Sequence, residues 1–278
     1  MRIAVVHSTL YRYSAPVYLE PHVIRLRPRE DAVQRLASWT LDISPTPHGR
    51  SESLDQDGNV VVRAWFDGLA EELSLRSAFT LETFRENPFN YLLTAADIQL
   101  PMRYAPLLRA SLEPCLRHDH SPKIRQFAES LAAECGWQTT AFLNALNQWL
   151  FSTTQQVVRE LGPPHSAETT LADRKGSCRD LAVLFCAACR AVGLAARFIS
   201  GYERDASLTE NGDLHAWAEV YLEGAGWTGY DPSRSLAVAA SHVAVAAASD
   251  PLLAAPVTGS YRGSATAKME FSISMQAE

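Results

Sequence analysis

The feature that most constrains the fold of this chain is a change in hydrophobic periodicity near Asn87-Pro88. Before this point, apolar residues alternate with period two in short runs that end at turn residues, which predicts β-strands. Asp57-Gly58-Asn59 is typical of a tight hairpin between two such runs. After this point, apolar residues recur at helical spacing, most clearly in residues 121–135 and 178–192. A chain that keeps the two patterns in separate segments is expected to be an α+β protein.

The same change divides the chain into two predicted domains. Residues 1–95 are expected to form a small β-rich, sandwich-like domain, because their strands follow one another through short turns with no helical pattern between them. Residues 96–278 are expected to form an α+β core, in which helices precede three strand-like runs. These runs are residues 195–202, 215–222 and 227–230, and a final strand at Met269–Met275 is expected to return to this core.

Composition limits the class of protein and of partner. The 278 residues include 25 Lys and Arg against 31 Asp and Glu, a formal net charge of −6. Since phosphate-binding surfaces are usually basic, we expect no nucleic acid partner. No apolar run approaches the ~20 residues of a membrane span, and the N-terminus lacks a signal-peptide pattern, so no membrane association is expected. Five cysteines do not suggest a disulfide framework, which favours the reducing cytoplasm; the oligomeric state stays open.

A thiol stands at the beginning of the strongest predicted helix. Cys178 follows Gly176-Ser177, and the first turn of a helix presents unpaired N–H groups and the positive end of the helix dipole. Both stabilise a thiolate, which is the nucleophilic form of cysteine. The alternative interpretation is a small buried hydrophobic residue, as for most single cysteines. The position at the helix start, and not on its apolar face, favours the nucleophile.

A thiolate nucleophile needs a base beside it and a group that orients the base. His215 lies in an alternating run in which Trp217 and Glu219 share its face, while apolar residues occupy the other face. Asp231 ends the next strand-like run, and the short connection predicts an antiparallel hairpin that brings Asp231 to the far imidazole nitrogen of His215. The alternatives are a structural histidine and an aspartate that only forms a turn.

Several further residues are candidates for supporting roles. Trp217 and Trp227 are expected to pack in the sheet and to exclude water from the cleft. Glu219 is either a group behind His215 or an exposed strand charge. An oxyanion hole would use the Cys178 N–H together with a second donor. The candidates for that donor are Trp149, Gln155 and Gln156, among which the sequence does not choose.

Two cysteine-containing motifs do not predict a metal or redox site. Cys186-Ala187-Ala188-Cys189 lies inside a predicted helix, whereas a redox pair would begin one, and no second such motif completes a zinc site. We therefore expect these cysteines to pack in the core. Residues 115–120 (CLRHDH) lack ligand spacing for a metal and are expected to be a solvated loop. No metal or cofactor is expected.

Taken in order, the motifs of the chain resemble the bacterial transglutaminase-like superfamily. The motifs of the core are residues 175–182 (KGSCRDLA), 193–202 (GLAARFISGY), 215–221 (HAWAEVY), 226–227 (GW) and 230–233 (YDPS). Residues 7–13 (HSTLYRY) and 25–29 (RLRPR) resemble the N-terminal region found in bacterial members, and residues 256–263 (PVTGSYRG) resemble their tail. The resemblance covers most of the chain and specifies the superfamily without specifying a substrate.

The resemblance implies a papain-like fold, in which the helix bearing the cysteine packs on an antiparallel sheet, with Cys178, His215 and Asp231 as a catalytic triad. Such an enzyme acts on amide bonds of a protein or peptide through a thioester, as a peptidase or amidase or as an acyl transferase to amines. A second hypothesis is a catalytically silent module used for protein–protein interaction. A further alternative is that the β-rich domain carries the binding function and presents a substrate protein.

Overall fold

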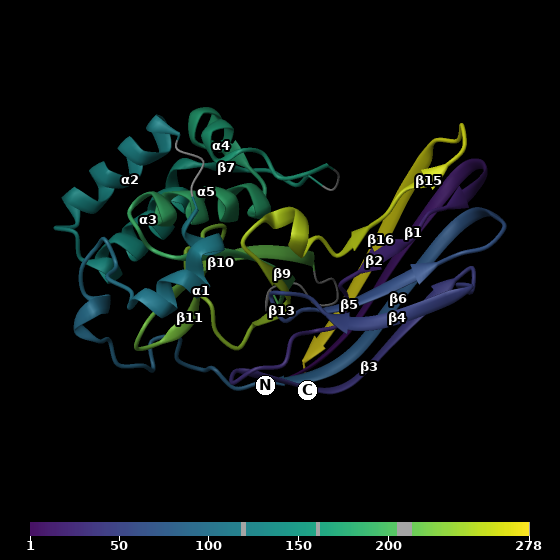
Figure 1. The fold of residues 1–278 in the computed structure, drawn as a ribbon, viewed down its shortest axis with the longest axis horizontal. Helices are drawn as coiled ribbons and strands as arrows, with labels where there is room; N and C mark the ends of the chain where they lie inside the picture. Colours follow the sequence, from purple (N-terminus) through teal and green to yellow (C-terminus); the bar gives the residue numbers. More distant parts are fainter. Residues whose placement is uncertain (118–120, 160–161, 205–212, 278) are drawn as a thin grey trace.

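The computed structural model describes residues 1–117, 121–159, 162–204 and 213–277. The chain is α+β, as predicted, with long strands on one side and helices around a second sheet on the other (Figure 1). Both termini lie at the same end of the long strands (Figure 1). The solvated loop predicted at residues 115–120 is wrong for its first two residues, since Cys115 and Leu116 end a helix that begins at Pro106 and are buried; residues 118–120 lie outside the described residues. In the described part of the chain, no helix is long and apolar enough to cross a membrane.

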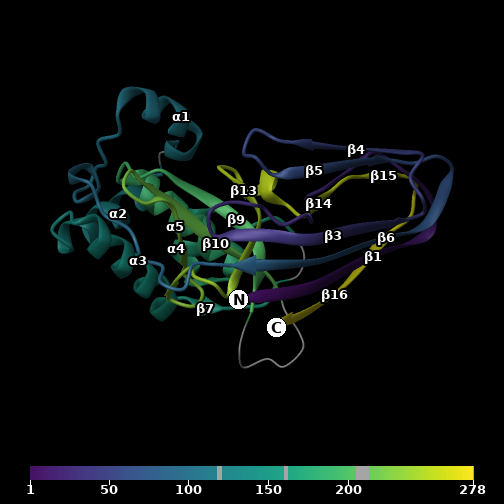
Figure 2. The same cartoon turned by 90° about the horizontal axis from the view of Figure 1, so that it is seen from below.

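Two antiparallel sheets form the N-terminal sandwich (Figure 2). One has the strand order β15-β1-β6-β3, with β16 also paired to β1, and the other has the order β14-β2-β5-β4. Buried apolar side chains such as Leu19, Ile24 and Leu73 pack together between the sheets. The predicted hairpin turn is present, with Gly58 at a φ of +75° between β4 and β5. The strands are β1 (Arg2–Leu19), β2 (His22–Ile24), β3 (Gln34–Ser44), β4 (Gly49–Leu54), β5 (Val60–Trp65), β6 (Leu69–Thr83), β14 (Val257–Thr258), β15 (Tyr261–Arg262) and β16 (Ala267–Ala277).

The last strand completes the sandwich and not the core. β16 pairs antiparallel with β1 from Ile3 opposite Ala277 to Tyr13 opposite Ala267. The prediction that the strand at Met269–Met275 returns to the α+β core is therefore wrong. Alternation identifies a strand, but the edge it joins depends on which neighbour has unpaired backbone groups. Since β6 pairs along one edge of β1, the other edge is available to β15 and β16.

The α-helices of the described residues are α1 (Pro106–Leu116), α2 (Pro122–Glu134), α3 (Thr139–Thr153), α4 (Ala167–Asp173) and α5 (Cys178–Ala191). Helices α2, α3 and α4 of the core pack against α5. The helix α2 lies in the predicted helical segment 121–135, and it begins with Ser121 Oγ accepting from the Ile124 N–H and Pro122 in the first turn. Helix α5 is central, and its side chains Leu181, Leu184 and Phe185 have no exposed surface. It packs against β9 and β10, as expected for a cysteine-bearing helix on a sheet.

The core sheet is antiparallel, in the order β12-β11-β10-β9-β13. The predicted hairpin of β10 and β11 is present, with Ala218 opposite Tyr230. The strand β13 arises from the Ala/Val-rich segment after residue 237, for which no strand was predicted. The strands are β9 (Ala196–Glu203), β10 (Asp213–Leu222), β11 (Gly226–Asp231), β12 (Leu236–Ala237) and β13 (His242–Ala248); a short parallel pair, β7 (Gln155–Gln156) and β8 (Lys175–Gly176), precedes α5.

The sandwich packs directly on the β9–β13 side of the core sheet. Apolar side chains from both parts form one buried cluster, in which Ile3 and Phe79 contribute from the sandwich and Tyr202 and Val243 from the core sheet. Polar bonds add to this contact, since the fully buried Asn59 side chain accepts from and donates to the main chain of β13. The two parts are thus held together by packing and by hydrogen bonds to the β13 backbone.

Candidate active site

Cys178 is the first residue of α5, and its position is fixed by a capping box. Asp180 Oδ2 accepts from both the N–H and the hydroxyl of Ser177, each at 2.8 Å. Burial raises the pKa of Asp180, but these bonds and the 2.5 Å ion pair with Arg159 outweigh it and lower the pKa. A Cβ atom on Gly176 would lie 2.9 Å from Asp180 Cβ, so the approach to the cap requires glycine. Helix geometry leaves the N–H of Cys178 without an intrahelical partner.

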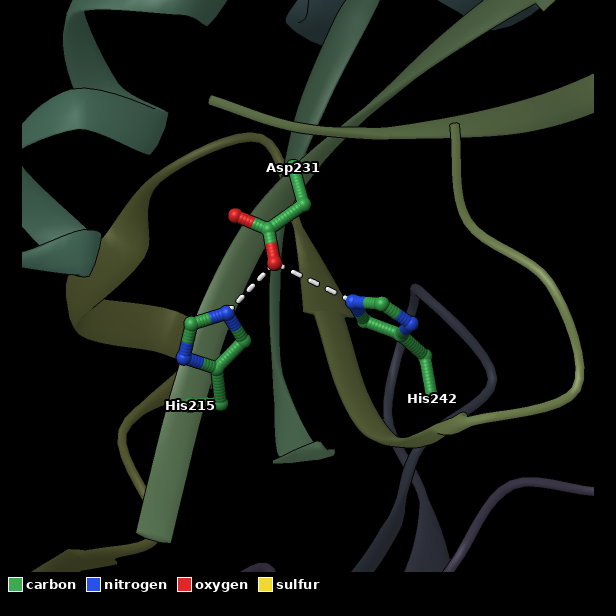
Figure 3. Close-up of side chains that lie close together, drawn as sticks. All are labelled: His215, Asp231 and His242. Atoms are coloured by element: carbon green, nitrogen blue, oxygen red, sulfur yellow. Dashed lines mark hydrogen bonds and ion pairs between the residues drawn. The ribbon is translucent and has the colours of Figure 1, made fainter. Parts of the chain in front are cut away.

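His215 and Asp231 are brought together by the β10–β11 hairpin, as the sequence predicts. His215 Nε2 donates to Asp231 Oδ2 at 2.6 Å, and both side chains are buried. The other imidazole nitrogen points away from Asp231 (Figure 3). Burial opposes a charge on His215, yet hydrogen bonds with Asp231 and Cys178, and their charges, raise the pKa of His215 to about 10. The thiol of Cys178 is therefore a neighbour of the imidazole that Asp231 holds.

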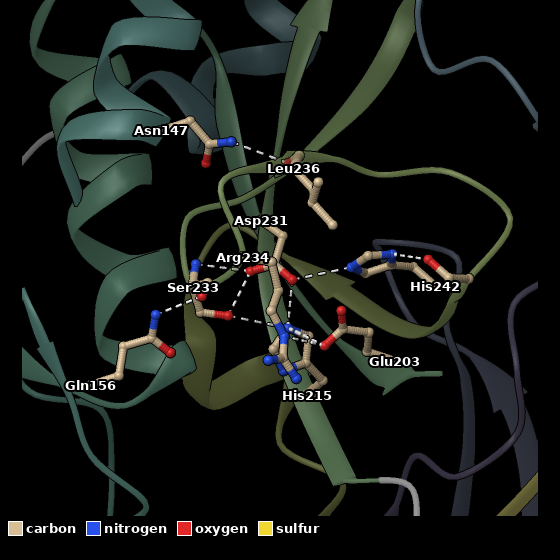
Figure 4. A network of polar contacts seen from close by, with 10 residues as sticks. Asn147, Gln156, Glu203, His215, Asp231, Ser233, Arg234, Leu236 and His242 are labelled. Carbon is tan, nitrogen blue, oxygen red and sulfur yellow. Dashed lines mark hydrogen bonds and ion pairs between the residues drawn. The ribbon is translucent and has the colours of Figure 1, made fainter. Parts of the chain in front are cut away.

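The carboxylate of Asp231 accepts four hydrogen bonds, which is close to its full capacity. Oδ1 accepts from the Ser233 N–H at 2.9 Å and from the Ser233 hydroxyl at 2.7 Å. Oδ2 accepts from His215 and, at 3.1 Å, from Nε2 of a second histidine, His242 (Figures 3 and 4). Burial alone would raise the pKa of Asp231, but the two imidazoles hold it well below its usual range.

His242 was not predicted as a site residue. It begins β13, its ring is buried, and Ser241 Oγ lies 3.1 Å from its Nδ1. The signal that could have pointed to it is that it is the single histidine in the apolar segment from residue 237 to residue 255. A histidine in such surroundings needs hydrogen-bond partners, but the sequence does not name them.

A metal ion is the alternative explanation for this cluster. One possible ligand atom from each of His215, Asp231 and His242 lies within 4.8 Å of the other two, the one such group among the described residues. Zinc holds nitrogen and oxygen ligands at about 2.0–2.1 Å in a tetrahedron, which separates two ligands by about 3.4 Å. The 2.6 Å between His215 and Asp231 is shorter and is the length of a charge-assisted hydrogen bond. The arrangement therefore fits proton sharing better than metal coordination.

A second carboxylate, Glu203 on β9, approaches the same imidazole. Its Oε2 lies 3.6 Å from His215 Nε2, and Arg234 Nε donates to that same oxygen at 2.8 Å (Figure 4). The guanidinium therefore compensates the charge of Glu203 beside the His215–Asp231 pair.

Of the predicted supporting residues, the structure places Trp217 next to the pair and the other two elsewhere. The Trp217 ring lies 6.2 Å from the His215 ring and 5.1 Å from the His242 ring, and it is almost completely buried. Glu219 instead pairs with Arg197 at 2.6 Å, and the Arg197 guanidinium lies over the Trp227 ring at 4.0 Å. Glu219 and Trp227 thus form a separate cluster farther along the sheet.

The candidates for an oxyanion donor are also separated by the structure. Gln156 pairs with Gly176 between β7 and β8, and Gly176 is two residues before Cys178. The side-chain amide of Gln156 donates to the Ser233 carbonyl at 2.5 Å (Figure 4). Trp149 instead packs against Phe127 and under Arg174. Gln156 therefore bridges the segment before Cys178 and the turn after Asp231.

The C-x-x-C pair packs in the core as predicted. Cys186 and Cys189 are buried on the inner side of α5. Burial raises the pKa of Cys186 to about 12 and that of Cys189 well above its usual value. Neither thiol has the surroundings of a reactive cysteine.

Comparisons with known proteins agree with this architecture. Residues 125–232 match the transglutaminase-like superfamily core, and residues 3–82 match the bacterial transglutaminase-like N-terminal region. An uncharacterized protein of Mycobacterium leprae is 26% identical over 267 residues, covering 94% of each chain, and one of Mycobacterium tuberculosis is 26% identical over 93% of this chain and 87% of its own. A solved structure from Cytophaga hutchinsonii, titled a "putative cysteine protease", superposes with a TM-score of 0.74 at 20% identity, covering 100% of this chain and 91% of that one.

Proposed function

Because this chain carries a transglutaminase-like superfamily core behind a bacterial transglutaminase-like N-terminal region, we propose that it is a cysteine-dependent enzyme acting on amide bonds. Cys178 is the proposed nucleophile, His215 the proton carrier and Asp231 the group that orients and stabilises the imidazolium. The observation that supports this proposal most is the buried 2.6 Å bond between Asp231 Oδ2 and His215 Nε2.

In the first half of the proposed reaction, the Cys178 thiolate attacks the carbonyl carbon of an amide. The N–H of Cys178, unpaired at the helix start, donates to the oxygen that becomes negative. The imidazolium of His215 gives its proton to the leaving nitrogen, so that the C–N bond breaks and an amine or ammonia departs. The acyl group remains on Cys178 as a thioester, and Asp231 holds the neutral imidazole in place.

In the second half, the neutral imidazole of His215 takes a proton from the incoming nucleophile. Water yields a carboxylic acid, whereas a primary amine yields a new amide, and in both cases the S–C bond breaks and Cys178 returns as thiolate beside imidazolium. We propose a protein or peptide substrate, because the reaction needs an amide carbonyl and a protein supplies these in side chains and main chain. A cytoplasmic location is part of the proposal and is supported by the five cysteines, all of which are free thiols.

The test is the alkylation of each of the five cysteines by iodoacetamide across pH 5–9, followed by peptide mass. We expect Cys178 to react much faster than the other four at pH 6–7. Cys135 is the matched internal control, because it is half-buried like Cys178 but does not stand at a helix start. Equal rates for the two cysteines would contradict the proposal and leave the silent interaction module as the better interpretation.

A second assay distinguishes the two possible outcomes of the thioester. The protein is incubated with a casein digest, with and without cadaverine, and the peptides are compared by mass. New peptide termini or released ammonia indicate hydrolysis, and cadaverine adducts indicate transfer. The Cys178→Ala variant should show neither, with a melting temperature within a few degrees of the wild type; equal product from that variant would contradict the role of Cys178.

A further inference from the structure

We propose that His242 is a positioning residue of the candidate active site, and that the N-terminal sandwich keeps it in place by binding the chain on both sides of it. This inference rests on the proposed roles of Cys178, His215 and Asp231. On this proposal the sandwich helps to position Asp231, because it binds the strand β13 that carries His242.

The first step is how Asp231 is held. Ser233 binds Oδ1 and is only two residues away, so it fixes the carboxylate relative to its own turn. Orientation toward β10 needs a contact from another element. Apart from His215 itself, the described residues provide one such contact, the Nε2 of His242 at 3.1 Å from Oδ2.

The second step is where His242 comes from. In the sheet order, β13 is three places from β11, on the far side of β10 and β9. Strands this far apart in a flat sheet are about 14 Å from each other. The 3.1 Å contact therefore requires the sheet to curve at this end, so that His242 and Asp231 approach across the His215 strand. Figure 3 shows the rings of His215 and His242 on either side of the Asp231 oxygen that both contact.

The third step is what holds His242. Two residues before it, the Ala240 carbonyl accepts from Thr83 Oγ1 at 2.8 Å; two residues after it, both backbone groups of Ala244 bond to the Gln34 side chain at 2.8 and 2.9 Å. Thr83 and Gln34 belong to β6 and β3 of the sandwich. The buried Trp217 ring packs against His242 and keeps water from the bonds it makes, which strengthens them.

The alternative is that His242 only fills space in the core, and a pair of substitutions distinguishes the two roles. His242→Gln keeps an N–H donor near the Nε2 position, whereas His242→Leu has similar volume but no donor. His22→Leu is the matched control, because His22 is also buried and hydrogen-bonded but lies in the sandwich, against Phe66. If His242 only fills space, His242→Gln and His242→Leu should affect the His215–Asp231 bond equally.

The readout is the deshielded N–H proton of the His215–Asp231 bond, followed by ¹H NMR and assigned by its loss in His215→Gln. Its disappearance on lowering the pH reports protonation of Asp231. The other titratable or charged groups that face this cluster are Cys178 on α5, Glu203 on β9 with its partner Arg234, and three groups that line a small cavity of about 30 Å³ together with His242, namely Glu219 on β10 and Asp31 and Arg85 of the N-terminal region.

We expect His242→Leu to raise the acid midpoint of this signal by about one pH unit, because the carboxylate of Asp231 loses a hydrogen-bond donor. A rise of one unit means that Asp231 binds a proton tenfold more tightly. His242→Gln should restore most of the shift, and His22→Leu should leave the midpoint unchanged. Gln34→Met, which removes the sandwich contact next to His242, should shift the midpoint in the same direction by less.

Equal midpoints in the wild type and His242→Leu, or equal shifts for Leu and Gln, would overturn the positioning role. A wild-type midpoint in Gln34→Met would overturn the part assigned to the sandwich. Iodoacetamide alkylation of Cys178 in the same samples separates this proposal from the proposed function. If the wild-type thiol is unreactive while the midpoints move as expected, the proposed function fails and the positioning of Asp231 stands.

Discussion

Replacing Asp231 by Asn tests the centre of the site, because the two side chains have the same shape but only the carboxylate can accept four hydrogen bonds. In the wild type, two donors from Ser233 meet Oδ1, and the imidazoles of His215 and His242 meet Oδ2. Asn has one acceptor oxygen and one NH₂ group. Whichever way the amide is turned, its NH₂ faces donors, and two buried donors lose their acceptor.

The magnitude follows from this count. A buried donor left without a partner costs about 1–3 kcal/mol, so two cost about 2–6 kcal/mol of unfolding free energy. Unfolding entropy is about 2.1 cal/mol/K per residue, which for 278 residues converts this loss into a lower melting temperature by about 3–10 °C. If Asp231 only formed a turn, the Asn oxygen could still accept both bonds from Ser233, and the melting temperature would hardly change.

The charge of Asp231 adds a pH dependence. Burial opposes the charge on His215, but Asp231 and Cys178 raise its pKa from 6.5 to about 10, so its contribution to stability is complete below pH 6.5 and is lost as the pH rises through 10. Burial likewise opposes the charge on Asp231, whose pKa the imidazoles lower, so its contribution is present above pH 3.8 and lost at lower pH. Both shifts describe one ion pair, which therefore stabilises the protein most between about pH 4 and 6.5.

The assay is thermal unfolding of the wild type and Asp231→Asn at pH 5, 7 and 9.5, followed by circular dichroism. We expect the difference in melting temperature to be largest at pH 5 and to shrink toward pH 9.5. At pH 7, iodoacetamide should alkylate Cys178 of the variant more slowly, but still measurably. A difference that is the same at all three pH values would refute the assignment of an ion pair, and an unchanged melting temperature would refute the four-donor geometry.

Three further predictions concern other parts of the molecule. Burial lowers the pKa of His7 to about 4, so at pH 5 this side chain binds a proton in the unfolded chain but not in the folded protein. Lowering the pH from 7.5 to 5 should therefore destabilise the wild type about 2 kcal/mol more than His7→Asn, as measured by urea unfolding. Gly176→Ala would place a Cβ within 2.9 Å of Asp180 Cβ, so the cap must shift, and alkylation of Cys178 should slow while circular dichroism stays native-like; an unchanged rate would contradict the steric argument. Asn59→Ala removes the two bonds to Ala247 of β13 and should cost about 2–4 kcal/mol in urea unfolding without a new thiol becoming reactive; a loss below 0.5 kcal/mol would show that these two bonds contribute little to joining the two parts.

Local sequence patterns predicted the features that depend on neighbouring residues. The start of α5 follows from Ser177 and Asp180, which form a capping box within four residues, and Cys178 stands at that start for the same reason. The pairing of His215 with Asp231 depends on a short hairpin, whose connection leaves little choice of register. Both features depend on residues close together in the sequence, so alternation, helix caps and turns are enough to predict them.

The features that the sequence did not predict depend on contacts between distant segments. The strand Met269–Met275 was identified, but its partner β1 is more than 250 residues away in the chain and was chosen by a free strand edge. Glu219 was placed correctly on the His215 face of β10, yet its partner is Arg197 on the neighbouring strand, which alternation within one strand cannot show.

His242 shows most clearly what only the tertiary structure decided. Its residue type and apolar surroundings are visible in the sequence, but its contact with Asp231 exists because the core sheet curves and because the sandwich binds β13 on either side of it. Sequence alone predicted the helix that begins at Cys178 and the two strands that carry His215 and Asp231, and with them the three candidate residues, but not the strand β13 that carries His242. The curvature of a sheet and the choice of a strand edge are set by the packing of the whole chain, since they minimise exposed apolar surface and unpaired backbone groups over many segments at once.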